Sequence, residues 1–229
     1  GFGALAAFHV LDDRQYRSHQ VCPRPGRGGS TVVRAAACPG LFDPALTLLG
    51  QAQEKWLHEG LAASRARWNV IAQQTLMAQV DRMPGEGQSF WTDGWDGYPA
   101  ARARLLRSVA ESRAANPLVL GGDVHMFIAA DLKIDFNDPA APVVATEFGG
   151  SSITSQGLPV KQVESWAGDN PHVKFVSSAR RGYGLLELAP KRCVARFRTI
   201  GDVTDPHTPV RTLASWTVED GRPGAQRGG

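Results

Sequence analysis

The sequence contains no long apolar run and carries little net charge. No stretch of eighteen or more apolar residues occurs, and the N-terminus lacks the charged and then apolar layout of a secretory signal. We therefore expect a chain that neither spans a membrane nor carries its own export signal. The 25 basic and 22 acidic residues leave a net charge of only +3, so bulk charge does not indicate a specific nucleic-acid partner.

Cysteine is also scarce, with only Cys22, Cys38 and Cys193. The first two lie in a Gly/Pro-rich stretch, residues 20–44, which predicts a surface loop. A disulfide between them would close a loop of about 15 residues and contribute roughly 3 kcal/mol. Two free thiols or a metal-binding pair are the alternatives. We favour the disulfide, which implies an oxidising compartment.

The first half of the chain alternates helical patterns with short apolar runs. The periodicity predicts helices at about 48–67, capped by Thr47, and at about 100–115. Apolar runs of strand length follow at 68–74 and 118–122. Because helices and buried strands alternate, we expect an α/β layer.

The second half consists mostly of strand-length runs, at 127–134, 142–148, 173–177, 184–188 and 194–200. Several alternate polar with apolar residues, which predicts an antiparallel sheet with a polar outer face. The fold class expected for the whole chain is therefore mixed, α/β with α+β character. We expect a single domain at 1–218 and a flexible, Gly/Arg-rich tail at 219–229.

The residues that indicate chemistry follow the apolar strand at 118–120. Gly121 and Gly122 permit a tight turn and a close approach of the backbone to an ion or a phosphate. Asp123 then offers a carboxylate oxygen and His125 an imidazole nitrogen, both of which bind metal ions. Sites in open α/β sheets form beyond the carboxyl ends of strands, and residues two apart in an extended segment point to the same side. The residues alone leave two interpretations open: Asp123 and His125 are metal ligands, or Asp123 caps a turn and His125 packs as a semi-buried histidine.

Nine segments, in this order along the chain, carry a family resemblance. They are LDDRQYR at 11–17, LGQAQEKWL at 49–57, WNVIAQQ at 68–74, DGWDGYP at 93–99, GDVH at 122–125, VATEF at 144–148, SSITS at 151–155, NPHVKF at 170–175 and RGY at 181–183. In this order they resemble the PhoD-like alkaline phosphatases and phosphodiesterases, which are calcineurin-like metallophosphoesterases. The resemblance extends from about residue 5 to about residue 200.

This resemblance implies the C-terminal half of a two-sheet β-sandwich flanked by helices, with metal ions at loop ends between the sheets. It implies metal-dependent hydrolysis of phosphate monoesters, diesters or both, with calcium and iron(III) as the metals. It also implies that Asp123 and His125 are metal ligands and catalytic residues. The family's first half supplies most of the metal ligands, so we expect these to be absent from this chain. The twin-arginine export of the family implies a secreted or periplasmic location, although the signal itself is not present in this chain.

Four more residues in the motif segments are expected to reach the substrate: Asp96, Tyr98, Glu147 and Ser152. Two of them have a structural alternative. Tyr98 could anchor its loop by burying aromatic area, and Ser152 could stabilise a turn. We interpret Asp12 and Arg14 as a structural ion pair at a strand end, in preference to phosphate ligands.

The competing hypothesis is a truncated, non-catalytic domain that binds phosphate or serves a structural or interaction role. In that case half of a two-sheet core would expose a large apolar face to water. No feature of the sequence indicates an oligomeric state.

Overall fold

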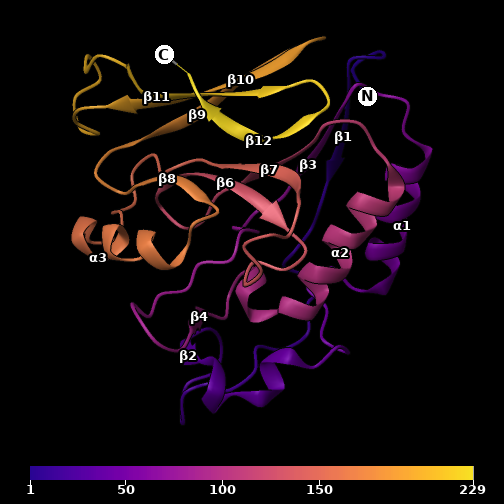
Figure 1. The fold of residues 1–229 in the computed structure, drawn as a ribbon. Helices are drawn as coiled ribbons and strands as arrows, with labels where there is room; N and C mark the ends of the chain where they lie inside the picture. The colour runs from indigo at the N-terminus through magenta and orange to yellow at the C-terminus, as the bar shows by residue number, and fades with distance from the viewer. Residues whose placement is uncertain (229) are drawn as a thin grey trace.

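The computed structural model describes residues 1–228. Two large β-sheets pack face to face, with helices on the outer side of the larger one, and a third sheet has two strands (Figure 1). The larger sheet contains β1 (Ala6–Val10), β3 (Trp68–Ala72), β5 (Pro117–Gly121), β6 (Phe127–Lys133), β7 (Val143–Gly149) and β8 (Val173–Ser177). The smaller sheet contains β9 (Arg181–Ala189), β10 (Arg192–Ile200), β11 (Arg211–Glu219) and β12 (Arg222–Arg227). The prediction of a mixed α/β fold is confirmed.

The larger sheet has the strand order β1-β3-β5-β7-β6-β8. Its first four strands are mutually parallel, whereas β6 and β8 are antiparallel to their neighbours. The predicted strands at 127–134, 142–148 and 173–177 therefore belong to this sheet and not to a separate antiparallel one. Because β1, β3, β5 and β7 run the same way, their carboxyl ends meet at one edge, where a site is expected.

Two helices, α1 (Gln51–Ala63) and α2 (Pro99–Ser112), cover one face of this sheet. Leu61 of α1 and Leu106 of α2 are fully buried in one core with Ile71 of β3. Helix α1 begins later than predicted, because Gly50 is the N-cap with a positive φ of 74°. Thr47 still supports this start, since its Oγ1 accepts a hydrogen bond from the Gly50 amide at 2.9 Å. The third helix, α3 (Val160–Ser165), was not predicted.

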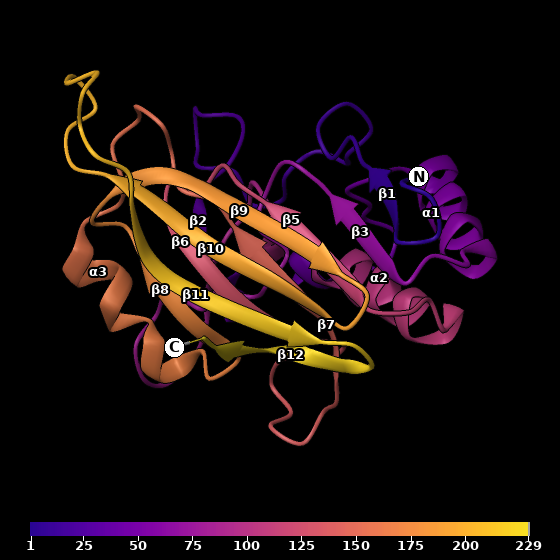
Figure 2. The ribbon, with the colours of Figure 1, turned by 90° about the horizontal axis from the view of Figure 1, so that it is seen from above.

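The smaller sheet packs over the opposite face, and Figure 2 shows it lying across the larger sheet. Its strand order is β12-β11-β10-β9, and all neighbours are antiparallel. Phe197 of β10 is the centre of an aromatic cluster, with ring centroids 5.0 Å from Phe127 and 5.7 Å from Phe175. Such contacts between rings add to the stabilisation from buried area. The antiparallel arrangement predicted from the alternation in β9 and β10 is confirmed.

The segment expected to be a flexible tail contains the edge strand β12; Gly229 lies outside the described residues. Contacts distant in sequence fix it to the larger sheet. The Gly224 amide donates to Thr146 Oγ1 at 2.9 Å, and the Ala225 amide donates to Asp131 Oδ1 at 3.0 Å. The composition of a segment does not reveal partners about 80 to 90 residues away, which is why the strand was missed.

The predicted surface loop at 20–44 is held at several points. A disulfide links Cys22 and Cys38, whose Cα atoms lie 6.1 Å apart, so this prediction is confirmed. Within the same stretch, β2 (Val32–Arg34) pairs with β4 (Ser89–Trp91) in a two-stranded antiparallel sheet. The assignment of residues 20–44 to a loop from glycine and proline density alone therefore missed β2.

The outer strand β1 leaves apolar side chains uncovered. Phe8 is 49% exposed and Val10 69% exposed, whereas Ala6, two residues earlier on the same face, is buried against the smaller sheet. The smaller sheet therefore does not extend over the carboxyl end of β1. None of the helices within residues 1–228 is long and apolar enough to cross a membrane.

Candidate functional site

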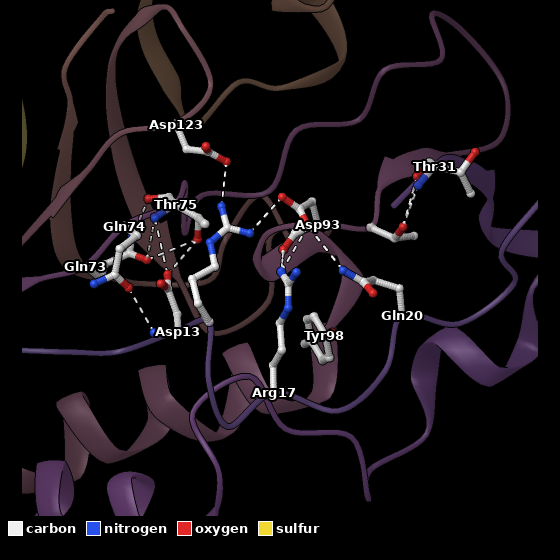
Figure 3. A network of polar contacts seen from close by, with 12 residues as sticks. Asp13, Arg17, Gln20, Thr31, Gln73, Gln74, Thr75, Asp93, Tyr98 and Asp123 are labelled. Atoms are coloured by element: carbon white, nitrogen blue, oxygen red, sulfur yellow. Dashed lines mark hydrogen bonds and ion pairs between the residues drawn. The ribbon is translucent and has the colours of Figure 1, made fainter. Parts of the chain in front are cut away.

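Loops from the carboxyl ends of the four parallel strands meet at one edge of the larger sheet. The Asp13 amide, after β1, donates to Gln74 Oε1, after β3, at 2.9 Å. Thr75 Oγ1 donates to Asp13 Oδ2 at 2.9 Å, and the Gly150 amide, after β7, donates to the Gly121 carbonyl at 3.1 Å. Figure 3 shows the first two loops together with Asp123. The loops that follow the parallel strands are thus brought together at one edge.

The turn after β5 is sharper than the sequence suggests. Asp123 and His125 both have positive φ, 67° and 54°, and the Val124 amide donates to the Gly122 carbonyl at 2.8 Å. The expectation that this segment is extended is therefore wrong. A left-handed conformation at a residue other than glycine costs about 1 to 3 kcal/mol, and such strain concentrates at functional sites.

Asp123 and His125 both remain accessible to solvent. The Asp123 side chain is 44% exposed and pairs with Arg14, whose Nη2 lies 2.9 Å from Oδ2. His125 Nδ1 lies 3.0 Å from the Gln156 carbonyl oxygen. Because a carbonyl only accepts, Nδ1 carries the proton, and the Nε2 of the neutral ring keeps a free lone pair. One carboxylate and one imidazole nitrogen are therefore available to a ligand.

These two donors fit part of a metal site. A carboxylate oxygen suits a hard cation such as calcium, and an imidazole nitrogen suits iron. A backbone carbonyl that fixes the other ring nitrogen is also the usual partner of a metal-binding histidine. Nevertheless, residues 1–228 contain no cluster of three or more His, Cys, Asp or Glu side chains that could enclose a metal ion. Asp123 and His125 would have to share a cation with other donors.

Arg14, Arg17 and Asp93 form a charged network that reaches Asp123 through Arg14; Figure 3 labels Arg17, Asp93 and Asp123. Arg14 Nη1 lies 2.8 Å from Asp93 Oδ2, and Arg17 Nη1 lies 3.0 Å from Asp93 Oδ1. Burial alone would raise the pKa of Asp93, but the ion pairs with Arg14 and Arg17 outweigh it and lower this pKa. Asp93 is therefore a fixed anion between two arginines.

The interpretation of Asp12 and Arg14 as an ion pair is wrong. Asp12 Oδ1 instead accepts hydrogen bonds from the amides of Arg14, at 2.9 Å, and Gln15, at 3.0 Å. These amide bonds lower the Asp12 pKa. An aspartate that closes a local turn in this way leaves the Arg14 guanidinium free for distant partners.

Asp96 and Tyr98 lie behind the site and not at its surface. Asp96 is buried, pairs with Arg102 Nη1 and accepts the Val80 amide at 3.0 Å. It lines a cavity of about 20 Å³ together with Asp123, which is room for roughly one water molecule. Tyr98 is 1% exposed, and its hydroxyl donates to the Ser18 carbonyl. Tyr98 therefore lies as its anchoring alternative describes, and Asp96 is likewise internal.

Glu147 is also internal. It lies within β7, is fully buried, and accepts the amides of Met77 and Ala78 at 2.8 and 2.7 Å. Burial raises the pKa of Glu147 to about 7. Its position indicates that it supports the loop after β3. Ser152 is half-buried, and its Oγ donates to the Ser155 carbonyl at 2.6 Å, within the loop that also holds His125.

Sequence reasoning missed Arg17 and Asp93, and gave Arg14 the wrong partner. Arg14 pairs across 79 residues with Asp93 and across 109 residues with Asp123. The available signal was position, since Arg14, Arg17 and Asp93 all lie in the segments that carry the family resemblance. Gln74 also joins the loops after β1 and β3, because its side chain donates to the Leu11 carbonyl at 2.6 Å.

Three comparisons with known proteins agree. The family model described as PhoD-like phosphatase matches residues 1–197. Alkaline phosphatase D of Bacillus subtilis (strain 168) is 34% identical over 229 residues, which cover 99% of this chain and 38% of that protein. A solved structure described as "Structure of PhoD" is similar with a TM-score of 0.87 and 33% identity, over 100% of this chain and 42% of that chain. This chain thus spans about two fifths of the length of either relative.

Proposed function

Since the chain belongs to the PhoD-like phosphatase family, we propose that it supplies part of the active site of a metal-dependent hydrolase of phosphate esters. The observation that carries this proposal is the pair Asp123 and His125. Both side chains reach solvent at the convergent strand ends, and each keeps an atom that can bind a cation. The proposed reaction is that of an alkaline phosphatase, acting on monoesters, diesters or both.

Asp123 and His125 would hold the metal through a carboxylate oxygen and Nε2. Calcium and iron(III) are the metals implied by the family, and further donors, including water and the phosphate oxygens themselves, would complete the coordination. A bound cation polarises the phosphoryl oxygens and lowers the pKa of an attacking water. His125 offers a second chemistry in place of metal binding, because an imidazole can act as a general acid toward the leaving oxygen.

The other candidate residues shape the site from behind. Glu147 and Asp96 hold backbone amides of the loop 75–80, and Tyr98 fixes the chain at Ser18. Of the four expected substrate contacts, Ser152 is the one that we propose near the substrate, because it is half-buried in the loop that holds His125. The Cys22–Cys38 disulfide supports a secreted or periplasmic location.

The second candidate function is a phosphate-binding unit without turnover. The shortage of metal donors favours it, since residues 1–228 contain no group of three or more His, Cys, Asp or Glu side chains that could hold a metal ion. Such a unit would bind phosphate beside Asp123 and release it unchanged.

Hydrolysis assays separate these functions. The purified chain is supplied with calcium and iron(III) and given p-nitrophenyl phosphate or bis(p-nitrophenyl) phosphate. We expect metal-dependent release of nitrophenol that His125→Ala abolishes and His207→Ala, at an exposed loop histidine, leaves unchanged. Phosphate binding without release would support the second function. Release that is equal for wild type and His125→Ala would contradict the proposed role of this histidine.

A further inference from the structure

Arg14 bridges two carboxylates that differ in how firmly they are held. Its Nη1 lies 2.8 Å from Asp93 Oδ2, and its Nη2 lies 2.9 Å from Asp123 Oδ2. Asp93 also accepts Arg17 Nη1 at 3.0 Å and Gln20 Nε2 at 3.2 Å, and its side chain is 20% exposed. Asp123, with 44% exposure, accepts no other hydrogen bond from the described residues. The contact with Asp93 is thus fixed, and the contact with Asp123 is exchangeable.

Hydrogen bonds of its own hold the backbone at Arg14, independently of these side-chain contacts. Gln53 of α1 accepts the Asp12 amide and donates to the Asp12 carbonyl, both at 2.8 Å. Asp12 in turn accepts the Arg14 amide at 2.9 Å. A helix therefore anchors the turn, and the turn directs the guanidinium toward Asp93. Pre-positioning of this kind reduces the entropy lost when a ligand binds.

A planar guanidinium can bind two anions at once, which an ammonium does less well. If Asp123 binds a cation, as the proposed function requires, its ion pair with Arg14 Nη2 weakens. The Nη2 group is then a free donor at the same solvent-exposed edge. The ligand that matches a free guanidinium N–H beside a cation is the non-bridging oxygen of a phosphoryl group.

We propose that Arg14 binds the phosphoryl group of the substrate through Nη2, and that Asp93 is the residue that positions it. This inference rests on the proposed function, since it requires phosphate at the edge that carries Asp123. It adds a phosphate ligand and a positioning residue to the site formed by Asp123 and His125. Asp93 acts through Arg14 and does not contact the phosphate.

The test measures the affinity of the metal-supplied chain for inorganic phosphate by equilibrium dialysis, alongside its metal content. Arg14→Lys keeps the charge but loses the two-armed geometry, and we expect its affinity to fall about tenfold or more. Arg196→Lys is the matched control, because Arg196 also forms an ion pair, with Glu187, on the smaller sheet. Its affinity should equal that of the wild type. The metal content of both variants should equal that of the wild type.

Asp93→Asn separates positioning from net charge. If charge alone governed binding, removal of this carboxylate would strengthen the affinity for phosphate. Positioning predicts that the affinity weakens, because the Asn amide holds Arg14 less firmly. Stronger binding by Asp93→Asn, or an Arg14→Lys affinity equal to that of wild type, would overturn the inference, as would failure of the wild type to bind phosphate at millimolar concentration.

The outcomes also separate this inference from the proposed function. In one outcome, the wild type turns over p-nitrophenyl phosphate while Arg14→Lys leaves both the KM and the phosphate inhibition constant unchanged. That result would support the proposed hydrolase function and reject the role of Arg14. Phosphate binding that depends on Arg14 in a chain without turnover would sustain the inference and reject hydrolysis by this chain.

Discussion

Replacing Gly121 by alanine would place a methyl group 2.3 Å from the Thr75 carbonyl oxygen, 3.0 Å from Glu147 Oε1 and 3.2 Å from Gln73 Nε2. The nearest atom belongs to the backbone, so rotation of a side chain cannot relieve the contact. Thr75 is buried and bonded to Asp13, which limits the retreat of its loop. The substitution therefore pushes the carboxyl end of β5 away from the loop that follows β3.

Overpacking a well-packed interior lowers the free energy of unfolding by about 1 to 3 kcal/mol. The upper part of that range applies at Gly121 because the atom in the way belongs to the backbone. Gly122→Ala is a neighbouring control. Its methyl group would meet only the Gln74 carbonyl oxygen at 3.6 Å, an ordinary contact, and Gly122 does not have a positive φ.

Urea unfolding of both variants, followed by tryptophan fluorescence, measures the difference. We expect Gly121→Ala to lose about 2 to 3 kcal/mol relative to wild type, and Gly122→Ala to lie within about 0.5 kcal/mol of it. Equal stability of the two variants would refute the argument that the two loops meet closely at Gly121.

Three further predictions concern stability. The Glu147 pKa of about 7 lies above its ordinary value of 4.5, so the folded state retains this proton longer than the unfolded state does. The contribution of Glu147 to the free energy of unfolding is therefore fully present below pH 4.5 and decreases by about 3 kcal/mol as the pH rises to 7. Denaturant titrations at several pH values should show this decrease, and Glu147→Gln should remove it. Arg102→Met leaves the buried Asp96 carboxylate without its cation and should cost about 3 to 5 kcal/mol, measured by the same unfolding assay; a change below 1 kcal/mol would contradict this. The double variant Cys22→Ser/Cys38→Ser should lose about 3 kcal/mol, and an unfolding midpoint that does not respond to reduction of the wild type would argue against the disulfide.

Local patterns in the sequence were sufficient to predict part of the fold. The runs at 68–74 and 173–177 are apolar and rich in strand-forming residues, and both are strands in the structure. Helix α2 was placed within a few residues, because its apolar stripe and the proline after it are local signals. The strand β12 was missed because its stability comes from Thr146 and Asp131 in the larger sheet.

The site could be predicted only in part for the same reason. Asp123 and His125 follow a buried strand and two glycines, a local signal that can be read without a structure. Their left-handed backbone and the pairing of Arg14 with Asp93 and Asp123 depend on packing and on contacts across 79 and 109 residues. Glu147 and Tyr98 likewise lie behind the site because they are buried, and the spacing of residues in the sequence does not reveal this burial.

The most direct test of the metal site is a crystal structure of the chain grown with calcium and iron(III), with diffraction data collected at the iron absorption edge. We predict an anomalous or calcium peak within about 2.6 Å of an Asp123 carboxylate oxygen, with His125 Nε2 in the same coordination sphere. A metal bound elsewhere, with Asp123 still paired to Arg14 and His125 Nε2 facing only solvent, would contradict the account.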